Sequence, residues 1–334
     1  MAGITVITVF HNRAHRVRPS IESLLAQDCD DVRIVAIDDG SRDDTLAELH
    51  ALSAPNLTVI SQPNKGFTAT MAAACAAADT DFIAVHGAGD ESLPGRLRAQ
   101  RDFLLAHPDA VAVGCAIENV EEGGKGYVIR PAQPIRKGPM IAGFGISHGE
   151  VMFRRSAYLA AGGYRPFFRV AQATDLFRRM SRIGDFGYVD QLLYRRFLFR
   201  DGVNASAAKF AEHELYSAIG HDAFADALSS GAAADVIDRY GVLAPYYMPR
   251  SKKIAGGLAR AAVVHWLQGD DRLARHLARR SLAEKLTPRG AIVATQLLLS
   301  TIGLRDAMQR LAVKTNRGRN EYALSRFYRP PAGK

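Results

Sequence analysis

Residues 32–41, VRIVAIDDGS, decide the fold. An apolar, β-branched run ends abruptly in Asp38 and Asp39, and the turn sequence Gly40-Ser41 follows. Such a run is typical of a strand that is covered on both faces. A turn alone explains Gly40 and Ser41 but not two acids on one strand end. The stretch therefore predicts a buried strand that carries two carboxylates to one edge of a sheet.

The same pattern recurs on both sides of this strand. Apolar runs predict further strands at 4–10, 57–61, 81–86 and 110–117. The segments between them predict helices at 17–27, 43–53, 67–78 and 95–106. Strand–helix alternation of this kind predicts an α/β fold with a doubly wound, mostly parallel, Rossmann-like sheet.

The pattern changes after residue 118. Residues 118–146 are rich in Gly and Pro and indicate loop or edge strand, and a strand-like segment at 149–153 precedes helices at 155–161 and about 173–183. From about residue 206 the sequence predicts helices only, including antiparallel hairpins at 250–268, 271–286 and 289–303. We therefore expect an α/β domain over 1–205 and a C-terminal all-α domain over 206–334.

Composition excludes several classes of protein. Cys29, Cys75 and Cys115 form no CxxC pair, which excludes a zinc ribbon and makes a disulfide framework unexpected. No targeting segment precedes the first strand, and the longest late apolar stretch, 291–304, is shorter than the ~20 residues a bilayer span needs. We expect a cytoplasmic protein.

Charge is concentrated at the C-terminal end. Residues 250–334 hold 18 basic and 5 acidic residues, a net charge of +13, which leaves −4 for the rest of a chain whose total is +9. A basic segment of this kind suits an anionic partner, either membrane headgroups or a polyanion, and the alternative is an ordinary solvated helical face. We expect an anionic membrane surface and no nucleic acid, with the protein peripheral at the inner face of the membrane.

Polar clusters follow four of the predicted strands: Phe10-His11-Asn12, Asp38–Ser41, Asn64-Lys65-Gly66 and His86–Asp90. Ligands of doubly wound sheets bind outside the carboxyl ends of the strands, so these clusters predict one site. The chain has no GxGxxG after its first strand, no GxxxxGK[ST] and no GxSxG. This excludes a dinucleotide fold, a P-loop NTPase and an α/β-hydrolase.

The ordered set of motifs resembles the family 2 glycosyltransferases of GT-A fold. The set consists of Thr8–Asn12, Ile37–Ser41, Asn64–Gly66, Val151–Ser156, Gly162–Tyr164 and Asp175-Leu176. The resemblance covers roughly residues 3–205. It implies a nucleotide-sugar donor, usually UDP-linked, inversion at the anomeric carbon, no organic cofactor and a divalent cation held by a DxD motif.

The resemblance also implies roles for single residues. Thr8 and His11 would line the nucleotide pocket, Asp39 would contact the base or ribose, and Lys65 would approach the phosphates. Asp38 is expected to act beside them as a structural anchor.

The stretch His86-Gly87-Ala88-Gly89-Asp90-Glu91 departs from the family pattern, because Gly87 and Gly89 replace the two DxD acids. Two readings stay open. Asp90, with Glu91, would hold Mg²⁺ or Mn²⁺ weakly, or glycine amides and cations such as Lys65 would stabilise the diphosphate directly. In the plainest alternative the glycines only turn the chain.

The proton acceptor also departs from the pattern. The position usual for the catalytic base is Ala173, and Asp175 is retained. An inverting transfer needs a group that takes the proton of the acceptor hydroxyl, and the candidates are Asp175, Glu150 and His148. The expected function is sugar transfer to a saccharide or lipid-linked acceptor in bacterial polysaccharide or glycoconjugate synthesis. The alternative is a catalytically degenerate nucleotide-sugar-binding scaffold.

Overall fold

The computed structural model describes residues 3–121, 126–131, 135–140, 144–198, 207–229 and 234–315. The chain divides into two compact units, Met1–Phe199 and Arg200–Lys334. The domain boundary predicted between residues 205 and 206 lies outside the described residues.

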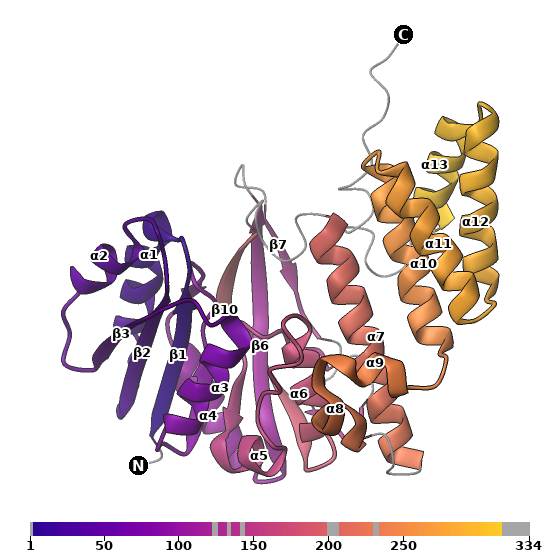
Figure 1. The fold of residues 1–334 in the computed structure, drawn as a ribbon. Helices are drawn as coiled ribbons and strands as arrows, with labels where there is room; N and C mark the ends of the chain where they lie inside the picture. The colour runs from indigo at the N-terminus through magenta and orange to yellow at the C-terminus, as the bar shows by residue number, and fades with distance from the viewer. Residues whose placement is uncertain are drawn as a thin grey trace. The chain divides into compact units, whose positions relative to one another are not determined.

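The first unit is built on one mixed sheet (Figure 1), whose strands are β1 (Ile4–Phe10), β2 (Val32–Asp39), β3 (Leu57–Gln62), β4 (Phe82–Val85), β5 (Glu91–Ser92), β6 (Ala110–Glu121), β7 (Gly126–Ile129), β8 (Ile135–Arg136), β9 (Met152–Arg154) and β10 (Asp185–Leu198). Their order is β3-β2-β1-β4-β9-β6-β10-β5, with β7 on β6 and β8 on β10. The half formed by β3, β2, β1 and β4 is wholly parallel, as predicted.

Parallel register brings the ends of these strands to one edge of the sheet. Phe10 at the end of β1 pairs with Asp38 on β2, and Asp38 pairs with Ser61 near the end of β3. The four polar clusters that follow the strands therefore leave the sheet from the same side.

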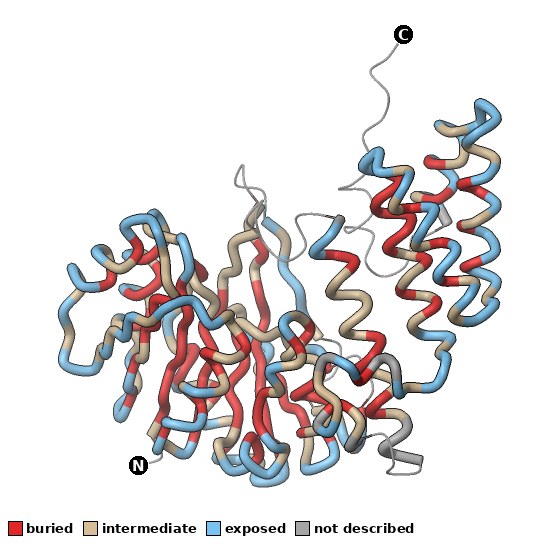
Figure 2. The backbone as a smooth tube through the Cα atoms, viewed as in Figure 1, coloured by how far each residue is buried: buried red, intermediate tan, exposed pale blue. Residues whose placement is uncertain are grey.

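Helices cover both faces of the sheet (Figure 2) and are α1 (Ala14–Leu25), α2 (Thr45–His50), α3 (Phe67–Ala77), α4 (Arg96–Ala106), α5 (Arg155–Ala160) and α6 (Gln172–Met180). Side chains alternate along each strand, so Ile7 and Ile83 pack with α3, α5 and α6, whereas Val6 and Ala84 pack with α1 and α4. Two cores result, one on each face.

Residues 185–198 are the main difference from the expected fold. They form the 14-residue strand β10, which pairs in parallel with β6 and shifts register between Val189 and Tyr194. Asp190, Arg195 and Arg196 interrupt the apolar pattern, so the sequence does not mark the strand. The stretch expected as loop or edge strand also extends β6 to Glu121 and contributes β7 and β8.

The second unit is helical in its described residues, as predicted. Its elements are α7 (Ala207–Ser229), α8 (Ala234–Tyr240), η1 (Gly241–Leu243), α9 (Ala244–Tyr247), α10 (Lys252–Leu267), α11 (Asp271–Glu284), α12 (Pro288–Leu299), η2 (Ser300–Ile302) and α13 (Arg305–Thr315). The side chains of Ser251, Asp270 and Thr287 cap the starts of α10, α11 and α12. Across the described ranges, no helix is both long and apolar enough to cross a membrane.

Candidate functional site

Asp39, at the end of β2, ties the β3–α3 loop to the sheet. Its carboxylate accepts hydrogen bonds from the backbone N–H groups of Lys65 and Gly66, each at 2.9 Å, and from Gln62 Nε2 at 2.7 Å and Thr70 Oγ1 at 3.1 Å. Burial opposes the charge, but these hydrogen bonds outweigh it and lower the pKa of the carboxyl below its ordinary value. The carboxylate of Asp39 thus accepts its hydrogen bonds from groups within the protein. Its expected contact with a base or ribose stays a prediction.

Asp38 anchors the turn that follows β2. It is buried, and its two carboxylate oxygens lie 3.3 and 3.4 Å from the backbone nitrogen of Ser41. Asp38 thus contacts the turn, and its expected role as a structural anchor stays a prediction.

His11 and Asn64 form the exposed part of this edge. His11 Nδ1 and Asn64 Nδ2 lie 3.0 and 2.9 Å from the carbonyl oxygen of Asp39, and 3.1 Å from each other. Lys65 is exposed beside them. The structure therefore brings His11 and Lys65 to one edge, as expected, with Asn64 between them.

Thr8 lies deeper than expected. It is fully buried within β1, and its hydroxyl has no hydrogen-bond partner among the residues the structure describes. Its expected place in the nucleotide pocket stays a prediction.

The β4–β5 loop is closed by what we call the Asp90 latch, made of Gly87, Asp90, Tyr194 and Phe197. Tyr194 Oη donates to Asp90 Oδ2 at 2.8 Å and accepts from the backbone N–H of Gly87, also at 2.8 Å. Asp90 Oδ1 accepts from the backbone N–H of Phe197 at 2.9 Å. Asp90 is 6% exposed, and burial raises the pKa of its carboxyl to about 7. Both oxygens are thus held by β10.

The latch explains the glycine at position 87. A Cβ there would lie 2.2 Å from Asp90 Oδ2 and 3.1 Å from Tyr194 Oη. Gly89, at φ 91°, has its N–H 3.3 Å from Ser20 Oγ. The N–H groups of both glycines are therefore engaged within the protein, which counts against the expected contact of these amides with a diphosphate.

The residues of this loop do not fit a metal ion. The oxygens of Asp90 accept from Tyr194 and Phe197, and Glu91 pairs with Arg16 at 2.9 Å and with Arg195 at 3.2 Å. Within the described chain, no group of three or more His, Cys, Asp or Glu side chains is placed to hold a metal. The loop offers neither the spaced acids nor the free carboxylate oxygens that Mg²⁺ or Mn²⁺ requires.

Asp175, the first candidate base, is clamped by two arginines. Arg165 binds it with Nε at 3.1 Å and with a second, closer contact through Nη2, and Arg179 binds it at 2.7 and 3.2 Å. Asp175 is 2% exposed. A buried carboxylate whose oxygens accept from two guanidinium groups has little access to an acceptor hydroxyl, so the geometry favours a structural role.

Glu150 is also inaccessible. It is fully buried, and its carboxylate accepts from the backbone N–H of Ser147 at 2.6 Å and from the Ser147 hydroxyl. Its backbone carbonyl accepts from Gln100 Nε2 at 2.7 Å. Glu150 therefore shapes the segment that leads into β9.

His148 sits between two of the strand-end clusters. Its ring packs edge-on against Phe67, which opens α3 directly after Lys65-Gly66, with centroids 5.4 Å apart. Its Nε2 lies 2.6 Å from Tyr164 Oη. The next residue, Gly149, adjoins the Asp90 latch, because a Cβ there would lie 3.0 Å from Tyr194 Oη. His148 is half-buried, and burial lowers its pKa to about 4, which keeps the ring neutral at pH 7.

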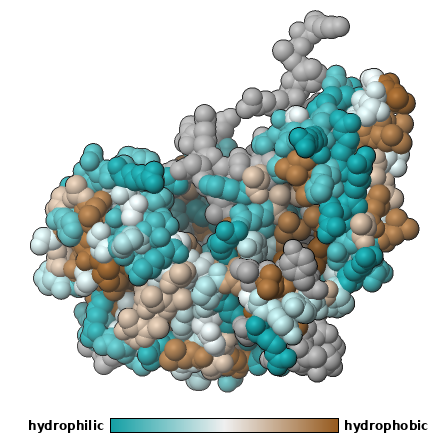
Figure 3. Space-filling view, in the orientation of Figure 1, coloured by the Kyte–Doolittle hydropathy of each residue, from teal (hydrophilic) through white to brown (hydrophobic). Residues whose placement is uncertain are grey.

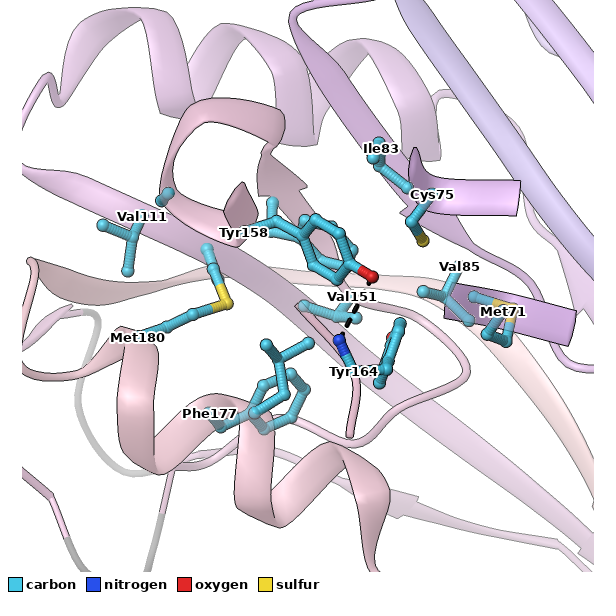
Figure 4. Close-up of a cluster of buried hydrophobic side chains, with 14 of the residues drawn as sticks. Met71, Cys75, Ile83, Val85, Val111, Val151, Tyr158, Tyr164, Phe177 and Met180 are labelled. Atoms are coloured by element: carbon cyan, nitrogen blue, oxygen red, sulfur yellow. Dashed lines mark hydrogen bonds between the residues drawn. The ribbon is translucent and has the colours of Figure 1, made fainter. Parts of the chain in front are cut away.

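Tyr158 holds the backbone of Tyr164, whose hydroxyl contacts His148 (Figure 4 shows the two tyrosines). Tyr158 Oη accepts from the backbone N–H of Tyr164 at 3.1 Å, and both rings belong to the core that also contains Met71 and Cys75. Gly163, at φ 65°, permits the bend that presents Tyr164. The GGY motif thus positions the hydroxyl that contacts His148.

Sequence reasoning missed Tyr194, Arg165 and Arg179. Tyr194 lies on the unrecognised strand β10, 104 residues from its partner Asp90. Arg179 is different, because its i,i+4 spacing from Asp175 on a predicted helix is a signal that was available.

Comparisons with known proteins identify the family and the fold. The family model described as "Glycosyl transferase family 2" matches residues 5–161. "Putative glycosyltransferase EpsE" of Bacillus subtilis (strain 168) is 32% identical over 200 residues, which cover 58% of this chain and 72% of that protein. The chondroitin synthase of Escherichia coli is 24% identical over 208 residues, 62% of this chain but only 30% of that longer protein.

Solved structures share the fold. S. aureus TarS 1-349 in complex with UDP has a TM-score of 0.57 at 14% identity, covering 89% of this chain and 92% of that one. The mannosyltransferase PcManGT from Pyrobaculum calidifontis, in complex with GDP-Man and Mn²⁺, has a TM-score of 0.54 at 17% identity, covering 98% and 85%. With the sheet, the motif order and these matches together, the chain belongs to glycosyltransferase family 2 and is an enzyme of GT-A fold.

Proposed function

We propose that this enzyme transfers a sugar from a nucleotide-sugar donor to a saccharide or lipid-linked acceptor, with inversion, in bacterial polysaccharide or glycoconjugate synthesis. The resemblance to a chondroitin synthase supports the polysaccharide setting. The neighbours that bind UDP and GDP-Man support a nucleotide-sugar donor, and we favour a UDP-linked one.

One observation carries the proposal. At the carboxyl edge of the parallel strands, His11, Asn64 and Lys65 are exposed side by side, and buried Asp39 fixes the loop that bears two of them. Doubly wound sheets bind their ligands at this edge. We assign His11 and Asn64 to the nucleoside and Lys65 to the diphosphate, because an ammonium group suits phosphate oxygens.

His148 is our choice for the proton acceptor. In the transfer, the acceptor oxygen forms a bond to the anomeric carbon, the bond from that carbon to the phosphate oxygen breaks, and the hydroxyl proton passes to a base. Asp175 and Glu150 are buried and engaged, whereas His148 is half-buried with a neutral ring. Tyr164 fixes the orientation of the ring. Burial lowers the pKa of His148 and makes the ring a weak base in the free protein, so the choice rests on its exposure and position and not on its basicity.

A divalent cation has little support from this chain's own side chains. The carboxylate of Asp90 is closed by the latch and Glu91 is paired with arginines. We therefore propose that neutralisation of the leaving diphosphate depends mainly on cationic side chains such as Lys65 and only modestly on Mg²⁺ or Mn²⁺.

The test is calorimetric titration of the whole chain with UDP, GDP and their sugar conjugates, in EDTA and in Mn²⁺, followed by donor turnover. We expect one nucleotide class to bind, with affinity in EDTA within about tenfold of that in Mn²⁺, and His148→Ala to retain binding while turnover falls about 100-fold or more. His50→Ala, an exposed histidine on α2, is the matched control.

Each contrary result has a distinct meaning. Binding without turnover in the unmodified chain would favour the degenerate scaffold. Complete loss of binding in EDTA, restored by Mn²⁺, would show that the latch opens for a metal. Full turnover in His148→Ala would return the search for a base to Asp175 and Glu150.

The charge of residues 250–334 supports a second partner. Their net charge of +13 suits an anionic membrane surface, and we propose that the enzyme works as a peripheral protein at the cytoplasmic face of the membrane. The other class of partner expected for a basic segment, nucleic acid, is not part of this proposal.

A further inference from the structure

From residue 290 onward, the outer face of α12 and of the η2 turn carries no charge. Residues 290–304 contain no Asp, Glu, Lys or Arg. On this stretch Ile292, Leu298, Ile302 and Leu304 are 54%, 69%, 70% and 44% exposed. We call these four residues the apolar strip.

The strip follows one side of the helix. Ile292, Thr295, Leu298 and Ile302 recur at intervals of three and four residues, which places them on one face, while Val293 and Leu297 pack into the core of the unit. A surface helix normally presents charged or polar residues on its outer face. Here the inner and the outer faces are both apolar, which indicates a face that meets something other than water.

Basic side chains flank the strip. The exposed side of α11 bears Arg272, Arg275, Arg279 and Arg280, which we call the arginine face, and α11 packs against α12. Lys285 and Arg289 are exposed at the start of α12, and Arg310 is exposed on α13. Figure 3 shows hydrophobic surface along the α12 side of this unit beside a hydrophilic column over α11.

An ion pair fixes the far end of the strip to the arginine face. Arg305, directly after Leu304, binds Asp271 at the start of α11 with bonds of 2.7 and 2.8 Å. Arg305 Nη2 also lies 3.5 Å from the carbonyl oxygen of Trp266, and Gln309 Nε2 donates to the same oxygen at 3.2 Å. The segment that follows Leu304 is therefore fixed to Asp271, the residue directly before Arg272.

From this arrangement we infer that the apolar strip is an interfacial element that enters the headgroup region of an anionic bilayer, with the arginine face on the lipid phosphates. The pairing of an uncharged apolar face with flanking Arg and Lys is what shallow insertion into an anionic surface requires. Such a surface offers apolar depth and negative charge together, which matches both halves of the patch. This inference rests on the membrane partner proposed above and is independent of the sugar-transfer proposal.

The test is flotation of the full chain with vesicles of phosphatidylcholine alone and with about one third phosphatidylglycerol, without donor or acceptor. We expect binding to the anionic vesicles only. The triple variant Ile292→Ser/Leu298→Ser/Ile302→Ser should bind these vesicles about tenfold or more weakly. The binding that remains in this variant should be sensitive to salt. The double variant Arg279→Glu/Arg280→Glu should bind the anionic vesicles more weakly than the unmodified chain at low salt. This difference should largely disappear at high salt.

Matched controls use the first unit. Leu159→Ser removes another exposed apolar side chain (47% exposed), and Arg182→Glu reverses an exposed arginine. Neither should change vesicle binding. Circular dichroism of each variant separates loss of binding from loss of fold.

The outcomes separate the two proposals. If the unmodified chain binds no anionic vesicle, both the membrane partner and the strip are wrong. If it binds and the triple serine variant binds equally well, charge alone carries the membrane contact and the strip is wrong. If the strip instead mediates a dimer, light scattering will show a dimer that the triple variant abolishes, and vesicle binding will be absent; that result overturns the inference.

Discussion

At the scale of single residues, the Asp90 latch accounts for the glycine that stands in place of an acid. Asp90 folds back over Gly87 and is held by Tyr194 and Phe197, so the space a side chain would need at position 87 is filled by a carboxylate. The presence of glycine at position 87 is thus coupled to the position of the Asp90 carboxylate, which fills the space that a side chain at 87 would need.

This coupling gives a prediction. Gly87→Ala should lower the free energy of unfolding by about 1–3 kcal/mol, because its Cβ would overlap an oxygen that cannot move away. In an Asp90→Ala background the same change should cost at least about 1 kcal/mol less, since the overlapping atoms are gone. Urea denaturation of the four proteins of the cycle measures the coupling.

Gly256→Ala is the control for the added methyl group. A Cβ at this helical position meets nothing within 4 Å, so the change should be neutral or stabilising. Equal costs of Gly87→Ala in both backgrounds would mean that the overlap is relieved elsewhere and that the latch does not fix position 87.

At the scale of elements, Asp39 shows how one side chain positions a loop. Four donors from β3, the loop after it and α3 converge on this carboxylate. The residue at the end of β2 therefore determines where Asn64 and Lys65 stand.

We accordingly expect Asp39→Ala to affect stability as well as binding. Loss of four hydrogen bonds, two of them from backbone N–H groups, should cost about 2–4 kcal/mol of unfolding free energy and weaken nucleotide binding in parallel. Asp38→Ala, which loses only the 3.3–3.4 Å contact with Ser41, should cost less. Thermal unfolding and nucleotide titration of both variants decide this, and an Asp39→Ala protein with unchanged stability would show that the loop has other supports.

The elements also show which strands can be predicted from the sequence. Strands β1 and β4 were predictable because both of their faces are buried and their sequences are near-continuous apolar runs. The strand β10 was not, since Asp190, Arg195 and Arg196 break its pattern and its register shifts beside β6. The same limit hid the latch, because a contact between positions 90 and 194 depends on strand order and leaves no local signal.

Residue types at the site were predictable, but their roles were less so. Sequence and family resemblance located the strand-end clusters and the candidates Asp175, Glu150 and His148. They did not indicate that Arg165 binds Asp175 or that Ser147 binds Glu150, although the i,i+4 spacing of Arg179 from Asp175 was an available signal. Which carboxylate is engaged depends on tertiary contacts, and these distinguish an anchor from a base.

At the scale of the whole molecule, buried Asp90 and half-buried His148 contribute opposite pH dependences to stability. The pKa of Asp90 is raised from 3.8 to about 7, so the folded chain binds more protons than the unfolded chain across this range, and its stability falls as pH rises. The pKa of His148 is lowered from 6.5 to about 4, so the unfolded chain binds more protons there, and stability rises with pH. Between about pH 4 and 6.5 the two effects oppose each other.

Removing one group should expose the other. Asp90→Asn should make stability rise with pH between about 4 and 6.5 by up to about 1.4 kcal/mol per pH unit relative to the unmodified chain, and the difference should cease above about pH 7. His148→Asn should do the reverse and steepen the fall toward neutral pH. Denaturation at a series of pH values measures both slopes, with exposed Asp81→Asn as the control. Because the slope and not the absolute stability is compared, any general cost of the substitutions drops out.

Parallel pH profiles for Asp90→Asn and the unmodified chain would mean that the Asp90 carboxyl is not shielded by the fold, and the latch would then have to be open in solution.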